Sequence, residues 1–392
     1  MSEEELSQWV KDRLAQAEER KDEVLIFEMP DPAEVERYIA AQMPQARDVT
    51  VSNLERIAYG AAREHYTFNA SWREGATEVN KTFVMLRDRE LLGDLVAHLE
   101  VMPAPDPMLF WLQGKGDRET EFRLLKCLEN TGVPAPHAWW LNMSGEWLQR
   151  PFMIQEKIPG QVAPSFTLLG LEDPAQKRVI GQQFVDILAR IHTVDWRATG
   201  MDFLGVPEAG SRSYPDKVIE CLDRRLAISC QERPETLRRA FLWLGANRPV
   251  METVALCHGD YKTDNIMFQG DRITAILDWE FAHLGDPLED VGWVCMRLYT
   301  AAGLCMGLVP RQEFLERYAE GVGRPLDPAR LRFWEVVNNV RMIAFSYTLL
   351  ESAKLSLQLA EEMQVDFEMP DPEGFWLSLV NRMMEDLEQL MA

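Results

Sequence analysis

Cysteine is scarce in this sequence, and no two cysteines have the spacing of a metal site. The six cysteines among the 392 residues lie at positions 127, 221, 230, 257, 295 and 305. Scattered cysteines of this kind are typical of reduced, mostly buried thiols in a cytoplasm. The sequence also lacks a bilayer-spanning apolar run and the charged-then-apolar amino terminus that directs secretion. We therefore expect a cytoplasmic protein with no membrane partner.

Positive charge is scarce as well. Lysine and arginine number 41 against 63 aspartates and glutamates, which gives a formal net charge of −22. Nucleic acid and anionic membranes are repelled by such a surface, so neither is expected as a partner. The acidity suits a cationic substrate, and it equally suits a protein that charge keeps soluble. The chain is long enough for two lobes, each with its own core.

The most informative segment is 256–280, where polar side chains stand at fixed spacing. Asp260 is followed two residues later by Lys262 and five residues later by Asn265. Asp278 comes directly after a β-branched and aliphatic run. This is the order and spacing of the catalytic and metal-binding groups in kinases.

A β-hairpin is predicted inside this segment. Two short apolar runs, 266–268 and 273–277, are separated by the turn signal at 269–272. The hairpin would fold the Asp278 carboxylate back beside Asn265.

Phosphoryl transfer needs a carboxylate that orients the attacking hydroxyl, oxygen ligands for Mg²⁺ and a cation near the moving phosphate. Asp260 is the candidate for the first role and Lys262 for the last, and both are predicted to be catalytic. Asn265 and Asp278 are the candidate Mg²⁺ ligands, because hard cations prefer oxygen. The alternative is that the aspartates cap turns and Lys262 is a surface residue. The full set at this spacing favours the catalytic interpretation.

Three neighbouring residues have supporting roles in this interpretation. His258 is expected to buttress the loop rather than exchange protons, because Asp260 already serves the hydroxyl. Asp290 is expected to support the loop backbone from the helix that follows. Asp286, next to Pro287, either forms a turn or touches a second metal site, and both alternatives stay open.

The motifs His-Gly-Asp at 258–260 with Asn265, Leu-Asp-Trp-Glu at 277–280 and Gly-Asp-Pro at 285–287 resemble the aminoglycoside phosphotransferase and choline kinase-like family. The likeness is strongest to the branch that includes the kinase domains of acyl-CoA dehydrogenase-like proteins. It extends over roughly residues 52–300. These motifs are specific for the reaction and say little about the substrate.

The resemblance implies an α+β, bilobal protein-kinase-like fold with ATP and Mg²⁺ in its cleft. A helical extension is expected over residues 1–50, and a β-rich, nucleotide-binding lobe over 51–156. A mostly helical lobe over 157–392 would hold the catalytic loop, metal site and acceptor pocket. Within the extension, Asp31 is the expected N-cap of a helix at 32–42. The extension would cover a lobe or mediate a homodimer.

The nucleotide-binding residues are inferred from the same resemblance. Gly60 begins a turn that suits a phosphate-covering loop, and a plain hairpin fits these residues equally well. Arg87, at the end of the third strand, would bind the α- and β-phosphates while Glu121 on the next helix holds it. Otherwise both residues are surface charges. Glu156 and Ile158 belong to the expected hinge, whose backbone would meet the adenine edge.

Three functions follow as hypotheses. The first is an ATP- and Mg²⁺-dependent phosphotransferase that acts on an alcohol group of a small molecule. The second is a hydroxyacyl-CoA kinase, which would need a basic patch for the CoA phosphates. Residues 211–240 include candidate cations for that patch, among them Arg212, Lys217, Arg224, Arg225 and Arg233. The third is a catalytically silent nucleotide-binding protein, and the intact Asp260, Asn265 and Asp278 argue against it. Neither the acceptor nor a preference for ATP over GTP follows from the residues.

Overall fold

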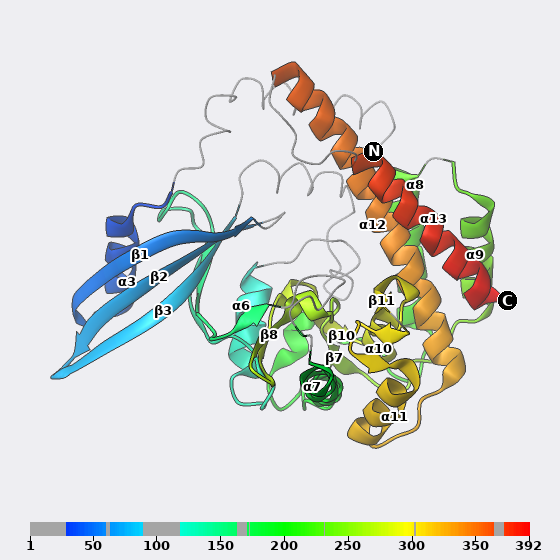
Figure 1. Cartoon of the computed structure of the whole chain (residues 1–392), viewed down its shortest axis with the longest axis horizontal. Helices are drawn as coiled ribbons and strands as arrows, with labels where there is room; N and C mark the ends of the chain where they lie inside the picture. The colour runs from blue at the N-terminus through cyan, green and yellow to red at the C-terminus, as the bar shows by residue number, and fades with distance from the viewer. Residues whose placement is uncertain are drawn as a thin grey trace. The chain divides into compact units, whose positions relative to one another are not determined.

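The computed structural model describes residues 29–59, 63–88, 118–162, 171, 173–230, 232–301, 303–363 and 372–392. The chain divides into two compact units. The first consists of Met1–Val101 with His137–Lys157, and the second of Met102–Pro136 with Ile158–Ala392. Figure 1 shows the sheet of the first unit and the helices of the second.

The first unit is built on a five-stranded antiparallel sheet with the order β1-β2-β3-β5-β4. Its strands are β1 (Arg47–Tyr59), β2 (Arg63–Glu74), β3 (Thr77–Asp88), β4 (Ala138–Asn142) and β5 (Phe152–Glu156). Gly75, with a φ of 62°, begins the two-residue turn between β2 and β3. Such a turn needs a positive φ, which glycine adopts without strain. From this turn the β2–β3 pairing runs unbroken to Arg63 and Asp88.

Helix α3 (Pro32–Gln42) packs against β1. It begins as predicted, because the Asp31 side chain accepts a hydrogen bond from the Ala33 amide at 2.9 Å and proline occupies the first turn. Its buried face includes Tyr38, whose ring meets that of Phe152 edge to face at 4.8 Å. The predicted extent of the helical extension is corrected, since β1 already begins at Arg47. Residues 1–28, where a further helix was predicted, lie outside the described residues.

The second unit is mostly helical. Its α-helices are α6 (Arg118–Leu128), α7 (Pro174–His192), α8 (Ser213–Ser229), α9 (Glu235–Ala246), α10 (Leu288–Val294), α11 (Arg311–Val322), α12 (Pro328–Met363) and α13 (Pro372–Met391). The long helix α12 packs against α8, α10 and α13, and α7 packs against α11 (Figure 1). Among the described residues, no helix has an apolar stretch long enough to cross a membrane.

Short strands complete the second unit and hold its loops. They are β6 (Gln161–Val162), β7 (Ala255–Cys257), β8 (Ile266–Gln269), β9 (Arg272–Ile276), β10 (His283–Gly285), β11 (Thr300–Ala301), β12 (Leu304–Cys305) and β13 (Val309–Pro310). They form three small sheets, with the orders β6-β8-β9, β10-β7 and β11-β12-β13. The first two of these sheets flank the segment that carries the predicted catalytic residues.

Helix α6 belongs to the second unit, although its residues fall inside the nucleotide-binding lobe predicted at 51–156. Its packing explains the difference. The helix contacts two 3-10 helices of the second unit, η2 (Met201–Leu204) and η4 (Trp279–Phe281).

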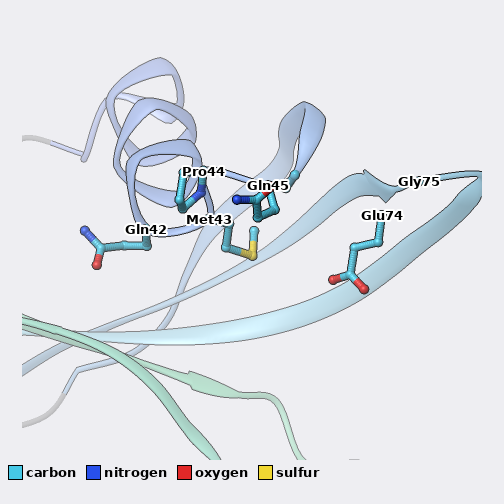
Figure 2. A pocket seen from close by; sticks show the side chains of 7 residues that line it. Gln42, Met43, Pro44, Gln45, Glu74 and Gly75 are labelled. Carbon is cyan, nitrogen blue, oxygen red and sulfur yellow. The ribbon is translucent and has the colours of Figure 1, made fainter.

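A cavity of about 570 Å³ opens in the first unit, between the end of α3 and the β2–β3 turn (Figure 2). Its lining consists of Gln42, Met43, Pro44, Gln45, Ala46, Glu74 and Gly75. Glu74, the ionisable member of this set, accepts a hydrogen bond from the Trp72 indole at 2.8 Å. The lining contains none of the residues predicted to carry chemistry.

Candidate active site

The predicted hairpin is confirmed. β8 and β9 pair antiparallel with Ile266 opposite Ile276. One step beyond that pair, the Leu277 amide donates a hydrogen bond to the Asn265 carbonyl at 2.7 Å. Asp278 is the next residue along the chain, so the hairpin brings the two predicted Mg²⁺ ligands to the same end of the sheet.

The Asp260 carboxylate lies within hydrogen-bonding distance of two side chains from its own loop. Its Oδ2 is 2.8 Å from Lys262 Nζ and 3.1 Å from Asn265 Nδ2. Asn265 Nδ2 also donates to the Asp260 carbonyl at 2.9 Å. With 6% of Asp260 exposed, these bonds fix the carboxylate in a largely dry environment. The loop thus brings together three of the predicted site residues.

Lys262 keeps its positive charge in this position. Burial by itself would lower the pKa of its ammonium group, but the Asp260 carboxylate more than compensates and raises that pKa above its ordinary value. A lysine that stays protonated beside a carboxylate can offer its charge to a phosphate.

Asp278 has an unusual backbone conformation. Its φ of 62° and ψ of 61° place it in the left-handed region, which aspartate tolerates better than most residues do. The side chain is exposed, whereas Trp279 is buried and donates its indole N–H to the Ile276 carbonyl at 2.9 Å. The buried tryptophan holds the turn while the carboxylate stays accessible.

Gly259 allows the catalytic loop to pass close to another backbone segment. Its φ is +79°, and a Cβ at this position would lie 2.4 Å from the Phe281 carbonyl oxygen. Any other residue would therefore displace this loop or the η4 backbone.

His258 supports the loop, as predicted. Its Nε2 lies 3.0 Å from the Leu277 carbonyl, and its Nδ1 accepts from the Asp260 amide at 3.3 Å. These partners correspond to a neutral imidazole with its proton on Nε2. Burial lowers the pKa of the imidazole below its ordinary value, which favours the same form. His258 therefore ties the Asp260 loop to the strand end that leads into Asp278.

Asp290 holds the loop backbone from α10, as predicted. Its carboxylate accepts from the amides of His258 at 2.7 Å and Gly259 at 2.9 Å. His192 Nε2 lies 3.1 Å from the same carboxylate, and the other ring nitrogen lies 2.6 Å from the Tyr318 hydroxyl. Burial would raise the pKa of the Asp290 carboxyl, but the hydrogen bond and charge of His192 lower it to about 2. Asp290 is therefore a fixed anion beneath the loop.

A family model described as the phosphotransferase enzyme family matches residues 81–334 of this chain. The chain belongs to this family. The family predicted from the loop motifs is thereby confirmed, and the protein is a phosphotransferase, as predicted.

Known proteins resemble this phosphotransferase in sequence over about half of the chain and in fold over most of it. Mouse acyl-CoA dehydrogenase family member 10 is 28% identical over 53% of this chain and 20% of its own length, so the chain spans about one fifth of that relative. A solved structure from Ralstonia eutropha JMP134, named as a candidate aminoglycoside phosphotransferase, has a TM-score of 0.64 and 20% identity, with 92% of this chain and 97% of that chain covered. A thermostable mutant of aminoglycoside phosphotransferase APH(4)-Ia, solved with AMP-PNP and hygromycin B, has a TM-score of 0.53 and 15% identity, with 90% and 98% covered. These structures confirm the predicted kinase-like α+β fold.

Asp286 has a structural position in the phosphotransferase. Its two carboxylate oxygens accept from Arg330 Nη2 at 2.9 and 2.8 Å, and one of them also accepts from the Leu288 amide at 3.0 Å. The residue is fully buried. The sequence left two alternatives open for Asp286, a turn or a second metal site. This geometry favours the turn, because both carboxylate oxygens already accept hydrogen bonds from Arg330 and one also accepts from the Leu288 amide, where α10 begins.

Arg87 is held within the first unit by Glu64, a residue that the sequence analysis did not single out. Arg87 Nε and Nη2 donate to Glu64 Oε2 at 2.9 and 2.7 Å. The Tyr66 hydroxyl donates to the same oxygen at 2.8 Å, and Arg150 Nη1 lies 3.7 Å from the other one. Burial would raise the pKa of Glu64, but the hydrogen bonds from Arg87 and Tyr66 lower it. Glu121, the predicted partner, is buried in α6 of the second unit, and its pairing with Arg87 stays a prediction.

The nucleotide contacts of the remaining predicted residues are not tested by the structure. Gly60 lies outside the described residues. Glu156 pairs with Lys81 at 3.0 Å, and its amide donates to the His137 carbonyl at 2.9 Å. Ile158 is half-buried and begins the second stretch of the second unit. The contacts of Glu156 and Ile158 with a nucleotide stay predictions.

Arg341 lies beside the catalytic loop, and the sequence analysis did not single it out. It extends from α12, and its Nη1 donates to the Gly259 carbonyl at 2.8 Å. No motif signals it, because it lies about 80 residues beyond the loop in a helix of mostly apolar residues.

Proposed function

We propose that this phosphotransferase transfers the γ-phosphate of ATP, with Mg²⁺, to a hydroxyl group of a small molecule. The observation that carries the proposal is the contact of the Asp260 carboxylate with Lys262 at 2.8 Å and Asn265 at 3.1 Å. A carboxylate, a cation and an amide oxygen at one loop are the groups that this reaction needs. The AMP-PNP bound by the APH(4)-Ia neighbour supports ATP as the donor.

Asp260 orients the acceptor hydroxyl and takes up its proton at a carboxylate oxygen. Because phosphoryl transition states are loose, this role consists mainly of positioning. The bonds from Lys262 and Asn265 hold the carboxylate in place for this purpose. Lys262, which stays protonated, neutralises charge on the transferred phosphate.

Asn265 and Asp278 fit a Mg²⁺ site. The Asn265 amide nitrogen is engaged as a donor to Asp260, so the amide oxygen is the atom that would bind the metal. Asp278 adds an exposed carboxylate on a strained backbone at the same hairpin end, and strained residues of this kind cluster at ligand sites. When bound, Mg²⁺ neutralises charge on the phosphates of the nucleotide.

An acceptor screen tests the proposed function. The purified protein is incubated with ATP, Mg²⁺ and panels of aminoglycosides, amino alcohols and hydroxyacyl-CoAs, and both ADP and phosphorylated acceptor are measured. We expect product from at least one panel, with about 10²–10⁴-fold slower formation by Asp260→Asn. Asp271→Asn, in the exposed turn of the same hairpin, is the matched control and should retain activity. Equal turnover by Asp260→Asn and the wild type would contradict the role of Asp260.

A hydroxyacyl-CoA kinase is the second candidate, supported by the sequence likeness to an acyl-CoA dehydrogenase family member. The cations counted for it in 211–240 form a weaker patch than their number suggests. Arg224 and Arg233 are bonded to Glu220 and Asp223, so their charges are partly neutralised. Phosphorylation confined to the CoA panel would favour this candidate. Nucleotide binding without any transfer would favour the catalytically silent alternative.

The binding partners and the cellular location of the protein are also proposals. We propose a small-molecule acceptor as the main partner, with no nucleic-acid or membrane partner, and a cytoplasmic location. A homodimer mediated by the segment 1–50 is likewise proposed, and light scattering of the purified protein tests it.

A further inference from the structure

A buried histidine holds the backbone where the Asp278 turn meets the catalytic loop. His283 begins β10, and its Nδ1 lies 2.9 Å from the Phe281 carbonyl oxygen. Phe281 ends η4, the short helix that directly follows Asp278. Its carbonyl is also the group against which Gly259 packs, since a Cβ at Gly259 would lie 2.4 Å from that oxygen. The His283 ring therefore holds a carbonyl that borders both the proposed metal ligand and the Asp260 loop.

The partners of the His283 ring determine where its protons lie. A carbonyl oxygen only accepts, so Nδ1 carries a proton and donates it to Phe281. With Nδ1 protonated, a neutral ring has a lone pair on Nε2. This Nε2 lies 3.2 Å from Oε2 of Glu289, and both side chains are buried. Two acceptors at this distance repel each other unless a proton lies between them, so the pair needs one more proton.

The other polar groups around the pair have their own partners. Tyr214 of α8 donates its hydroxyl to Glu289 Oε2 at 3.2 Å, and the Asp286 amide donates to Oε1 at 2.8 Å. The Asp286 carboxylate is neutralised by two bonds from Arg330 of α12. The Cys257 sulfur of β7 lies within 4.8 Å of the ring nitrogen and of the Glu289 oxygen. Burial and the nearby carboxylates raise the pKa of this thiol well above its ordinary value, so it stays neutral.

The environment of Glu289 favours the protonated pair. Burial raises the pKa of the Glu289 carboxyl, the bond and charge of His283 oppose this effect, and the charge of Asp286 adds to it, with a net rise. Asp290, the next acid on α10, directs its carboxylate to His192 and to the amides of the catalytic loop. The pair thus keeps its proton while the neighbouring acid serves the loop directly.

We propose that His283 and Glu289 share one buried proton and act as positioning residues for phosphate transfer. The proton orients the ring, the ring holds the Phe281 carbonyl, and that carbonyl sets the spacing between Asp278 and the Asp260 loop. This inference rests on the proposed function and adds two residues that act through others. Without the proton, two lone pairs face each other and the ring loses its orientation. The positioning is therefore present at low pH and is lost as the pH rises.

Replacing Glu289 by glutamine fixes a proton in the shared position. The amide nitrogen of Glu289→Gln can donate to His283 Nε2 at every pH, while its oxygen still accepts from the Asp286 amide. Hydrolysis of ATP, with Mg²⁺ and with water as the acceptor, is measured from about pH 6 to pH 10. We expect the wild-type kcat to fall toward high pH and that of Glu289→Gln to be independent of pH. Glu252→Gln, the same change in a side chain that is 70% exposed, is the matched control and should fall like the wild type.

Two substitutions of His283 separate the roles of its nitrogens. His283→Gln places an amide near the position of Nε2 and loses the bond to Phe281, so kcat should fall about 10- to 100-fold with little change in the KM for ATP. His283→Asn places an amide near the position of Nδ1 and keeps that bond. Made together with Glu289→Gln, which removes the buried acid, it should stay within about threefold of the wild type. Hydrogen exchange in segment 278–283, followed by mass spectrometry, should be faster in His283→Gln alone.

Nitrogen-15 NMR of labelled histidine tests the proton without any reaction. The His283 signals are assigned by their loss in His283→Gln, and we expect a hydrogen-bonded Nε2 at neutral pH. A bare Nε2 at neutral pH, a wild-type kcat that does not fall, or a fall in Glu289→Gln like that of the wild type would overturn the shared proton. Equal kcat and equal exchange in the two His283 variants would overturn the positioning role while upholding the phosphotransfer. The expected NMR and exchange results without any turnover of ATP would uphold the support of η4 and count against the proposed reaction.

Discussion

Replacing Glu64 by glutamine tests how Arg87 is held. Arg87 donates two hydrogen bonds to one Glu64 oxygen, at 2.9 and 2.7 Å, and only 5% and 1% of the two side chains are exposed. Removing one partner of a buried ion pair typically costs about 3–5 kcal/mol, because the other charge stays buried. Glutamine keeps an acceptor oxygen for one bond, so we expect the free energy of unfolding to fall by about 3 kcal/mol.

The same change should weaken nucleotide binding. If Arg87 binds the α- and β-phosphates, losing its fixed position should raise the KM for ATP about tenfold, or about 1.4 kcal/mol. Urea unfolding measures the first effect and steady-state kinetics the second. Glu74→Gln, at the far end of the same strand, is the control and should leave the KM unchanged.

A comparison with Glu121→Gln shows which carboxylate, that of Glu64 or that of Glu121, positions Arg87. If Glu64 positions Arg87, Glu64→Gln should have the larger effect on the KM for ATP. The reasoning is refuted if Glu64→Gln leaves the KM unchanged while Glu121→Gln raises it tenfold. In that case the helix residue predicted from the kinase resemblance holds Arg87 during turnover.

Three further predictions concern the catalytic loop. Asp260→Asn should lower kcat by about 10²–10⁴-fold with unchanged nucleotide affinity, and a kcat within about tenfold of the wild type would contradict its role. Asp278→Ala should weaken Mg·ATP binding far more than metal-free ATP binding, and equal losses in calorimetry with and without Mg²⁺ would contradict metal ligation. Asp290→Asn should cost about 2 kcal/mol of unfolding free energy above pH 4, because the pKa of Asp290 is about 2 in the folded protein against an ordinary 3.8. Stability from a lowered pKa is lost as the pH falls through the folded value, so the gap between wild type and variant in urea unfolding should shrink toward pH 2. A gap independent of pH would show that the carboxylate charge contributes nothing.

The part of the site that could be predicted from sequence is local. Asp260, Lys262 and Asn265 lie within six consecutive residues, so their spacing alone limits how far apart their side chains lie. The hairpin to Asp278 was also readable, because turn residues separate two short apolar runs. Neither prediction needed knowledge of how distant helices pack.

The partner of Arg87 could also have been found, and the signal was the β2–β3 turn. Gly75 and Ala76 form a two-residue turn, and such a turn fixes every cross-strand pair beyond it. Glu74 and Thr77 are the pair next to the turn. Counting ten residues back from Glu74 gives Glu64, and counting ten residues forward from Thr77 gives Arg87, so Glu64 and Arg87 are paired in the sheet. The kinase resemblance directed attention to the helix instead, although the strand register already placed a carboxylate opposite Arg87.

Arg341 could not have been found in this way, for a reason that lies in α12 itself. A helix reveals which face meets its neighbours only when its apolar residues form a single stripe. The first half of α12 is buried nearly all round, at Leu331, Phe333, Trp334, Val336, Val337, Val340, Ile343 and Ala344. Periodicity therefore predicts the helix and leaves its rotation undetermined, so nothing in the sequence shows that Arg341 faces the loop. The loop motif specifies the reaction from a few neighbouring residues. The position of Arg341 depends on how α12 packs beside the loop, and the sequence pattern leaves that packing unspecified.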